Sequence, residues 1–144
     1  MLIFLPPVMR GIIAWLLLVI NTLVLVPFLL LVSIARFPIP VASWQRFCTN
    51  VAIKIAELWI SNNSVWMRLT QKMNWDVEGI EALDKDQWYL VTSNHQSWSD
   101  IFILQYLLNR KIPMLKFFLK KELIWVPVIG AAWWALDFPF MKRY

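Results

Sequence analysis

The stretch WYLVTSNHQSWSDIFILQYLLN, residues 88–109, changes character twice within a short distance. It opens with bulky and branched residues at 88–92, which predict a β-strand. A polar run follows at 93–100 and contains His95, the only histidine of the chain. Apolar residues then return at 101–108 and predict a helix. A strand, a polar loop and a helix in this order are typical of α/β folds, which place their chemistry at the carboxyl ends of strands.

The segments around this stretch extend the same alternation. WDVEGI at 75–80 and IPMLKFFL at 112–119 predict strands, and FPFMKRY at 138–144 predicts a strand at the carboxyl terminus. Between the last two, KKELIW at 120–125 begins a helical segment that continues past Pro127 to residue 136. Strands alternating with helices predict an α/β fold with a mixed sheet in residues 73–144.

The amino-terminal part predicts a membrane anchor in residues 1–36. No charged residue occurs from 11 to 35, and Arg10 and Arg36 bracket this run. A helix of that length extends roughly 37 Å, enough to cross a hydrocarbon core of about 30 Å. Pro27 is expected to kink the helix, and a re-entrant hairpin bent at Pro27 is an open alternative. A cleaved signal peptide is another, although the apolar run exceeds the usual length of one.

Residues 37–72 contain a second helical pattern. Apolar and polar residues recur on opposite faces from Trp44 to Ile60, which predicts an amphipathic helix. This helix either packs on its own domain or lies in the membrane interface, and the pattern favours neither. Arg36, Arg46 and Lys54 follow the anchor, so the distribution of basic residues weakly favours a cytoplasmic position for the rest of the chain.

The composition restricts the class of function. Of the 144 residues 60% are hydrophobic and only 16% are charged, and the net charge is +5. An anionic membrane or a phosphorylated substrate suits this balance better than nucleic acid, because no long Lys/Arg tract is present. A single cysteine and a single histidine exclude a His/Cys metal cage. The three glycines lie outside any Gly-rich phosphate loop or nucleophile elbow, so we expect neither a metal nor a cofactor.

His95 and Asp100 are the candidate catalytic residues. If the loop brings them together, the carboxylate can hold one nitrogen of the imidazole and leave the other to accept a proton from a hydroxyl group. The alternative is structural. Ser97 and Asp100 have the spacing of a helix N-terminal capping box, and His95 can be an ordinary loop histidine.

The polar loop resembles the His-x4-Asp signature of the glycerolipid acyltransferase family. Members commonly read Asn-His-x-Ser-x-x-Asp after an apolar strand, as residues 94–100 do. VEGIEAL at 77–83 resembles the segment that leads into that strand. A second family block is matched by Lys121, Glu122, Leu123, Pro127, Gly130 and Arg143. The resemblance covers roughly residues 75–144, and WALDFPFMKRY is similar to a bacterial inner-membrane branch related to lysophospholipid-remodelling enzymes.

The resemblance implies a function. Its members transfer a fatty acyl group from acyl-CoA or acyl-carrier protein to 1-acylglycerol-3-phosphate, giving phosphatidic acid, without a covalent acyl-enzyme. His95 is then the general base and Asp100 its orienting partner, while Asn94, Lys121 and Arg143 are the candidate substrate-binding residues. The implied partners are a lysophospholipid, an acyl donor and an anionic membrane, with the catalytic part on the cytoplasmic side of a bacterial inner membrane.

Two further expectations remain from the sequence. The family carries a later Glu-Gly-x-Arg-type segment, which this sequence does not contain up to Tyr144. We therefore expect residues 73–144 to be the first half of the catalytic domain, and the 144-residue chain to be inactive alone. Two alternatives stay open: reacylation of another lysophospholipid, and a non-catalytic membrane-anchored module.

Overall fold

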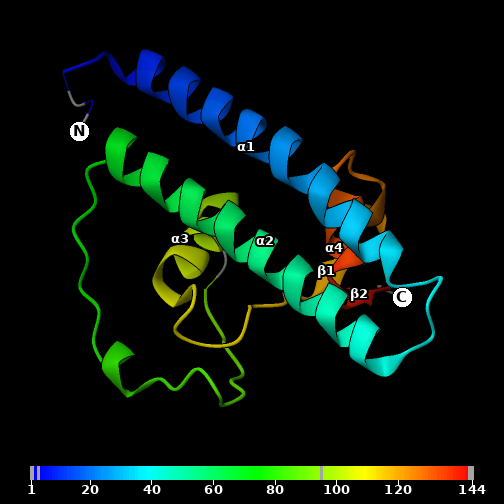
Figure 1. Cartoon of the computed structure of the whole chain (residues 1–144). Coiled ribbons are helices and arrows are strands. Elements are labelled where there is room, and N and C mark those ends of the chain that lie inside the picture. Colours follow the sequence, from blue (N-terminus) through cyan, green and yellow to red (C-terminus); the bar gives the residue numbers. More distant parts are fainter. Residues whose placement is uncertain (1, 3, 95, 143–144) are drawn as a thin grey trace. The chain divides into compact units, whose positions relative to one another are not determined.

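The fold is known from a computed structural model that describes residues 2, 4–94 and 96–142 (Figure 1). Two long helices open the chain, and shorter elements follow. In chain order these elements are α1 (Pro7–Ala35), α2 (Ala42–Thr70), the 3₁₀ helix η1 (Ile80–Ala82), α3 (Trp98–Leu108), β1 (Leu119–Lys120), the 3₁₀ helix η2 (Lys121–Trp125), α4 (Ile129–Ala135) and β2 (Phe140–Met141). The described part of the chain is therefore mostly helical, with a small sheet.

The chain divides into two compact units, and both long helices contribute to each. Unit 1 consists of residues 1–19 and 60–115, so it contains the start of α1, the end of α2, and α3. Unit 2 consists of residues 20–59 and 116–144, so it contains the end of α1, the start of α2, and the elements from β1 to β2. The loop that carries the His-x4-Asp motif thus belongs to unit 1, and the second motif block belongs to unit 2.

Helix α1 confirms the predicted apolar helix and extends it by one turn at its amino end. Pro7 occupies the first helical position, where its missing N–H group costs no hydrogen bond. Pro27 lies within the helix, which continues without interruption to Ala35. The alternative of a hairpin that reverses at Pro27 is therefore wrong. Among the described residues, α1 alone is long and apolar enough to cross a membrane, judged by length and composition only.

Helix α2 extends ten residues beyond the carboxyl end of the predicted amphipathic pattern, from Ile60 to Thr70. The additional turns contain SNNS at 61–64, whose side chains compete with the helical backbone in other contexts. Here the side chains of Asn63 and Ser64 bond within the helix. Ser64 Oγ donates to the carbonyl of Ile60, and Trp66 Nε1 donates to Asn63 Oδ1. Thr70 closes the helix by donating its hydroxyl to the carbonyl of Trp66. Local hydrogen bonds therefore continue a helix beyond the point where the apolar periodicity weakens.

In unit 2 the two long helices are joined by polar contacts as well as by apolar packing. Asn21 Nδ2 donates to the carbonyl of Trp59 at 2.9 Å, and Trp59 Nε1 donates to Thr22 Oγ1 at 3.0 Å. Near the connection between the helices, Trp44 Nε1 donates to the carbonyl of Ala35. The polar side chains in the middle of α1 thus point inward, to partners on α2.

The sheet is much smaller than the predicted mixed sheet. Strands β1 and β2 form one parallel pair, with Leu119 opposite Phe140 and Lys120 opposite Met141. Helices η2 and α4 connect them, which is the crossover that a parallel pair requires. The α/β prediction is therefore supported only for residues 119–141, in a single strand–helix–strand unit.

The strands predicted at 75–80 and 88–92 are absent from the described structure. Gly79 adopts a left-handed φ of 77° and starts η1, which ends the first segment in a turn. In the second segment Trp88 and Leu90 are 90% and 83% exposed, and the hydroxyl of Tyr89 accepts a hydrogen bond from the backbone N–H of Asp84. A strand requires a neighbouring strand to receive its backbone hydrogen bonds, and β propensity alone does not provide one.

Helix α4 packs closely on η2 because of two local features. Val128, just before α4, has a φ of 66°, and the N–H of Ile129 donates to the carbonyl of Pro127 at 2.7 Å. This is a tight γ-type turn. Gly130 follows in the first turn of α4, and a Cβ atom at this position would overlap the carbonyl of Ile124. A residue without a side chain is therefore needed for α4 to approach η2.

We predict opposite effects for alanine at two helical glycines. Gly130→Ala should lower the free energy of unfolding by about 1–3 kcal/mol, because the backbone of η2 must shift to make room. Gly11→Ala in α1 should raise it by about 0.5–1 kcal/mol, because a Cβ there meets nothing within 4 Å and alanine favours the helix. Denaturant unfolding in detergent micelles measures both. Equal stability of Gly130→Ala and wild type would contradict the packing described for α4.

Candidate active site

The polar loop of unit 1 ends in a capping box at the start of α3. Ser97 is the N-cap residue, with an extended backbone, and its hydroxyl accepts a hydrogen bond from the N–H of Ser99 at 3.2 Å. Asp100, three residues further on, reaches back from the first turn of the helix. This arrangement supplies acceptors for N–H groups that the helix itself cannot satisfy.

The carboxylate of Asp100 is held by two backbone donors. Its Oδ2 accepts from the N–H of Gln96 at 2.6 Å and from the N–H of Ser97 at 2.8 Å. Two charge-assisted bonds to one oxygen fix the orientation of the carboxylate, and the helix dipole favours its negative charge. The acid of the His-x4-Asp motif is therefore an immobilised group that is turned back over the loop, toward residues 96 and 97.

Helix α3 is positioned by contacts with α2 and with the segment that precedes the loop. Phe102 packs edge-on against Trp66 at a centroid separation of 6.1 Å, and Asn109 Nδ2 donates to Ser61 Oγ at 3.0 Å. Tyr106 stacks on Trp75 with centroids 5.1 Å apart. These contacts lie on one side of α3 along its length, so they fix the helix whose first turn carries Asp100.

The predicted site residues are divided between the units. Asn94 is exposed and lies in the unit 1 loop that precedes α3, whose first turn carries Asp100. Lys121 is the first residue of η2 in unit 2, where its side chain is exposed. His95 and Arg143 lie outside the described residues. Of the five predicted residues, the structure thus describes Asp100, Asn94 and Lys121, and it gives detailed contacts for Asp100.

Comparison with known proteins identifies the part of the chain that carries these residues. Residues 74–144 match the family model named Acyltransferase. Through these residues the chain belongs to the glycerolipid acyltransferase family. No curated protein and no solved structure matches the chain. The family match covers both motif blocks, whereas α1 and α2 precede it.

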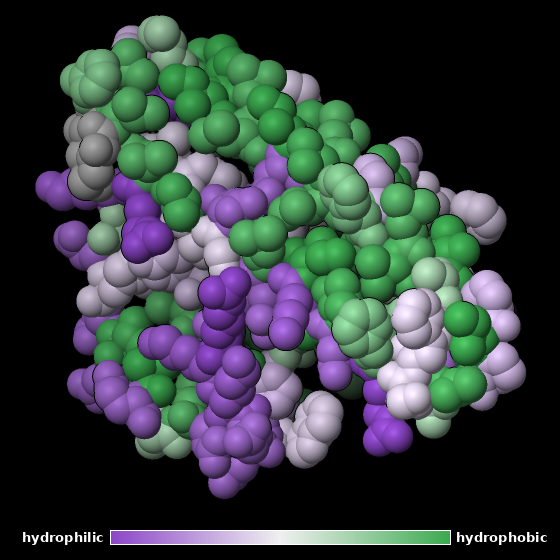
Figure 2. Space-filling model, viewed as in Figure 1, coloured by the Kyte–Doolittle hydropathy of each residue, from purple (hydrophilic) through white to green (hydrophobic). Residues whose placement is uncertain are grey.

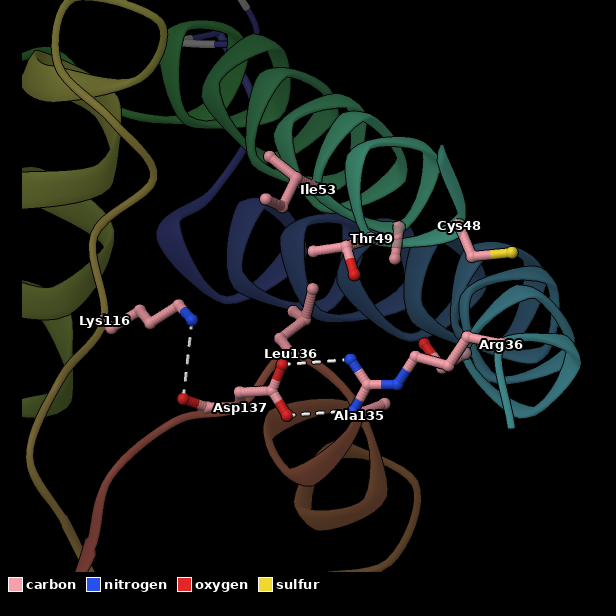
Figure 3. A pocket seen from close by; sticks show the side chains of 10 residues that line it. Arg36, Cys48, Thr49, Ile53, Lys116, Ala135, Leu136 and Asp137 are labelled. Atoms are coloured by element: carbon pink, nitrogen blue, oxygen red, sulfur yellow. Dashed lines mark hydrogen bonds and ion pairs between the residues drawn. The ribbon is translucent and has the colours of Figure 1, made fainter. Parts of the chain in front are cut away.

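Asp137 of the acyltransferase segment forms an ion pair with Arg36 that sequence reasoning missed (Figure 3). Arg36, directly after α1, donates two hydrogen bonds to the carboxylate of Asp137, at 2.9 and 3.0 Å. Lys116 Nζ approaches the backbone carbonyl of Asp137 at 3.5 Å. Asp137 has a φ of 57°, so it occupies the left-handed turn between α4 and β2. The pair therefore ties the end of α1 to the turn that leads into β2.

A small cavity lies beside this pair in unit 2. Its volume is about 10 Å³. Its lining includes Ser33, Cys48 and Thr49, together with the charged cluster of Arg36, Lys116 and Asp137. Ser33 Oγ is buried and has no hydrogen-bond partner among the residues that the structure describes. A cavity of this size accommodates about one water molecule, so it is too small for an acyl donor or a lipid headgroup. The sequence contained one indication of this charged cluster, because Asp137 is the only acidic residue after Glu122.

The ion pair shifts the acidity of both partners. The hydrogen bond from Arg36 holds the pKa of Asp137 below its ordinary value of 3.8, against the opposing effect of burial. The same hydrogen bond raises the pKa of Arg36. A carboxyl group with a lowered pKa in the folded state stabilises the protein above its ordinary pKa, and this contribution is lost as the pH falls through the folded-state value.

We predict that Asp137→Asn removes a pH-dependent part of the stability of unit 2. Asparagine tolerates the left-handed backbone, so the variant changes the charge with little effect on the turn. At neutral pH its free energy of unfolding should be lower than that of wild type by about 0.2–1 kcal/mol, the range of exposed ion pairs. Below pH 3.8 the difference should shrink. Urea unfolding across this pH range measures it, and a constant difference at every pH would contradict the assignment.

Proposed function

We propose that this protein transfers a fatty acyl group from acyl-CoA or acyl-carrier protein to the free hydroxyl of 1-acylglycerol-3-phosphate, which gives phosphatidic acid. The family match of residues 74–144 supports acyl transfer to a lipid. The observation that carries the proposal is the Asp100 carboxylate, which is fixed by two backbone N–H groups inside the His-x4-Asp motif.

In the proposed mechanism His95 is the general base and Asp100 orients it. The imidazole accepts the proton of the lipid hydroxyl while the oxygen attacks the thioester carbonyl. The new C–O ester bond forms, the C–S bond breaks, and the thiolate leaves and takes up a proton. A carboxylate that is already immobilised can fix the imidazole tautomer without rearranging during the reaction. General-base assistance of this kind contributes about 10²–10⁴-fold to the rate.

The remaining candidate residues have binding roles in this proposal. Lys121 and Arg143 are the cations that would contact the phosphate of the lipid or of the acyl donor, since both form charge-assisted bonds with anions. Asn94 precedes the base and would position the substrate. The exposed position of Lys121 at the start of η2 is compatible with a ligand contact. No metal or cofactor takes part in the proposed reaction.

We also propose that the reaction occurs at a membrane. Helix α1 supports attachment, because only 22% of its most apolar window is buried. A lysophospholipid substrate resides at the same surface. The finer assignment, an anionic bacterial inner membrane with the catalytic part on the cytoplasmic side, rests on the sequence resemblance and on the basic residues that follow the anchor.

A non-catalytic membrane-anchored module is the second candidate, and the capping box favours it. Ser97 and Asp100 together cap α3, so helix capping by itself accounts for both residue types. The two candidates make different predictions for variants that preserve the cap. Because the N–H groups of Gln96 and Ser97 both bond to Oδ2, the amide oxygen of an asparagine can accept both bonds.

We predict that His95→Ala and Asp100→Asn abolish acyl transfer in the full-length protein without altering its folding. Loss of the base should lower the rate by about 10²–10⁴-fold. Asp100→Asn keeps an acceptor for the capping bonds but removes the charge that stabilises the protonated imidazole, so the rate should fall while the unfolding midpoint changes little. Transfer of radiolabelled acyl groups to 1-acylglycerol-3-phosphate in membranes measures the rate.

Ser97→Ala is the matched control for these variants. It removes the N-cap hydroxyl and should lower stability by about 1 kcal/mol, yet it should retain acyl transfer because Ser97 has no chemical role. Unchanged transfer in both His95→Ala and Asp100→Asn would reject the catalytic proposal and leave the structural module.

A panel of lysolipids tests the choice of substrate. We predict that 1-acylglycerol-3-phosphate is acylated faster than lysolipids whose phosphate carries choline, ethanolamine or glycerol, because an unmodified phosphate offers more charge to the proposed cations. Mass spectrometry of the products measures this preference. Faster acylation of a substituted lysolipid would establish the alternative, reacylation of another lysophospholipid.

A further inference from the structure

Ser33 is a polar residue buried on the most apolar helix of the chain. Figure 2 shows apolar side chains along α1, and among them Ser33 is only 2% exposed. Its hydroxyl has no hydrogen-bond partner within the part of the chain that the structure describes. Burying a hydroxyl without a partner is costly, so nearly all buried polar groups in proteins bond either to protein or to ordered water. The position of Ser33 therefore requires a physical explanation.

Hydroxyl groups of α2 show the bond that a helical serine or threonine makes when no other partner is present. Thr49, Ser64 and Thr70 each donate to the backbone carbonyl four residues earlier, at 2.9 Å. The corresponding acceptor for Ser33 is the carbonyl of Leu29, and Ser33 makes no such bond to the described residues. Its hydroxyl is therefore available to a partner outside its own helix.

Ser33 lines the small cavity of unit 2 that lies beside the pair of Arg36 and Asp137 (Figure 3). The volume of this cavity, about 10 Å³, corresponds to one water molecule. Residues from three parts of unit 2 surround it: the end of α1, the first half of α2, and the end of α4 with the turn that follows. One small molecule in the cavity would therefore lie against all three parts.

The polar groups of the lining suit a molecule that both donates and accepts hydrogen bonds. The side chains of Arg36 and Lys116 can only donate, and the carboxylate of Asp137 can only accept. Thr49 Oγ1 already donates its proton within α2, so it remains as an acceptor. A monatomic anion suits this set poorly, because it would lie beside the Asp137 carboxylate. Water bonds to donors and acceptors alike, and a buried water needs two to four polar partners.

We propose that one ordered water molecule occupies this cavity, bonds to Ser33 Oγ and links α1 to α2 and to the turn that contains Asp137. The water gives the buried hydroxyl its partner, and a bridging water is nearly as favourable in enthalpy as a direct hydrogen bond. It connects the end of α1 to the acyltransferase segment a second time, beside the direct bonds from Arg36 to Asp137. This proposal does not depend on the proposed acyl transfer.

Crystals of the protein grown in sodium bromide test the occupant directly. Diffraction data collected at the bromine absorption edge distinguish bromide from water, because only bromide scatters anomalously there. The expected result is a density peak without anomalous signal, within hydrogen-bond distance of Ser33 Oγ and of at least one polar atom of Arg36, Thr49 or Asp137. An anomalous peak would assign the cavity to an anion and overturn the proposal. An empty cavity, or a Ser33 hydroxyl turned to the carbonyl of Leu29, would overturn it as well.

Ser33→Ala tests the same site in solution, with Ser64→Ala as the matched control. Both replacements remove a helical hydroxyl and gain the same helix propensity, and Ser64→Ala loses a bond to the carbonyl of Ile60. If water bonds to Ser33, both variants should unfold at a lower denaturant midpoint than wild type in detergent micelles, because each loses a hydrogen bond. A Ser33→Ala midpoint at or above that of wild type would show that the hydroxyl had no partner to lose, and the proposal would be rejected.

Discussion

The hydrogen bonds that join Asn21 and Thr22 to Trp59 determine which face of α1 is turned inward in unit 2. A helix this apolar could pack on α2 in many rotational positions by hydrophobic contact alone, because such contact is non-directional. Most of these rotational positions are excluded because the two polar side chains need hydrogen-bond partners. With the inner face fixed, the outer face is fixed as well, and every residue exposed on it between Arg10 and Arg36 is uncharged.

A specific polar contact also connects the end of α1 to the acyltransferase segment. Arg36 is the first charged residue after the apolar run, and it bonds to the turn between α4 and β2 through Asp137. The guanidinium also lies over the ring of Phe37 at 5.2 Å, while Phe37 stacks on Trp134 in α4. The residue that follows the helix is therefore bonded to the turn before β2, so the end of α1 and the family segment are joined within unit 2.

Local patterns in the sequence predicted the helices, but for the sheet they were right only near β1 and β2. The apolar run of α1, the periodicity of α2 and the apolar residues after Asp100 depend on contacts between near neighbours, so each helix was found. Strands depend on partners distant in the sequence, and Trp88 to Thr92 have strong β propensity without such a partner. The capping box was predictable from Ser97 and Asp100 alone, whereas the Arg36–Asp137 pair joins residues 101 positions apart and no spacing rule reveals it.

The two interpretations of Asp100 are compatible, because a capping carboxylate is already suited to an orienting role. Its two bonds to the backbone restrict the side chain to one rotamer and satisfy one oxygen from within the loop. In the proposed mechanism the acid partner of the base is thus fixed by the start of the helix and not by the substrate. Ser97 caps the same helix through its hydroxyl, which stabilises the start of α3 and gives Ser97 a structural role without a role in the chemistry. In the proposed mechanism, the capping bonds would therefore preorganise Asp100 as the orienting group before any substrate binds.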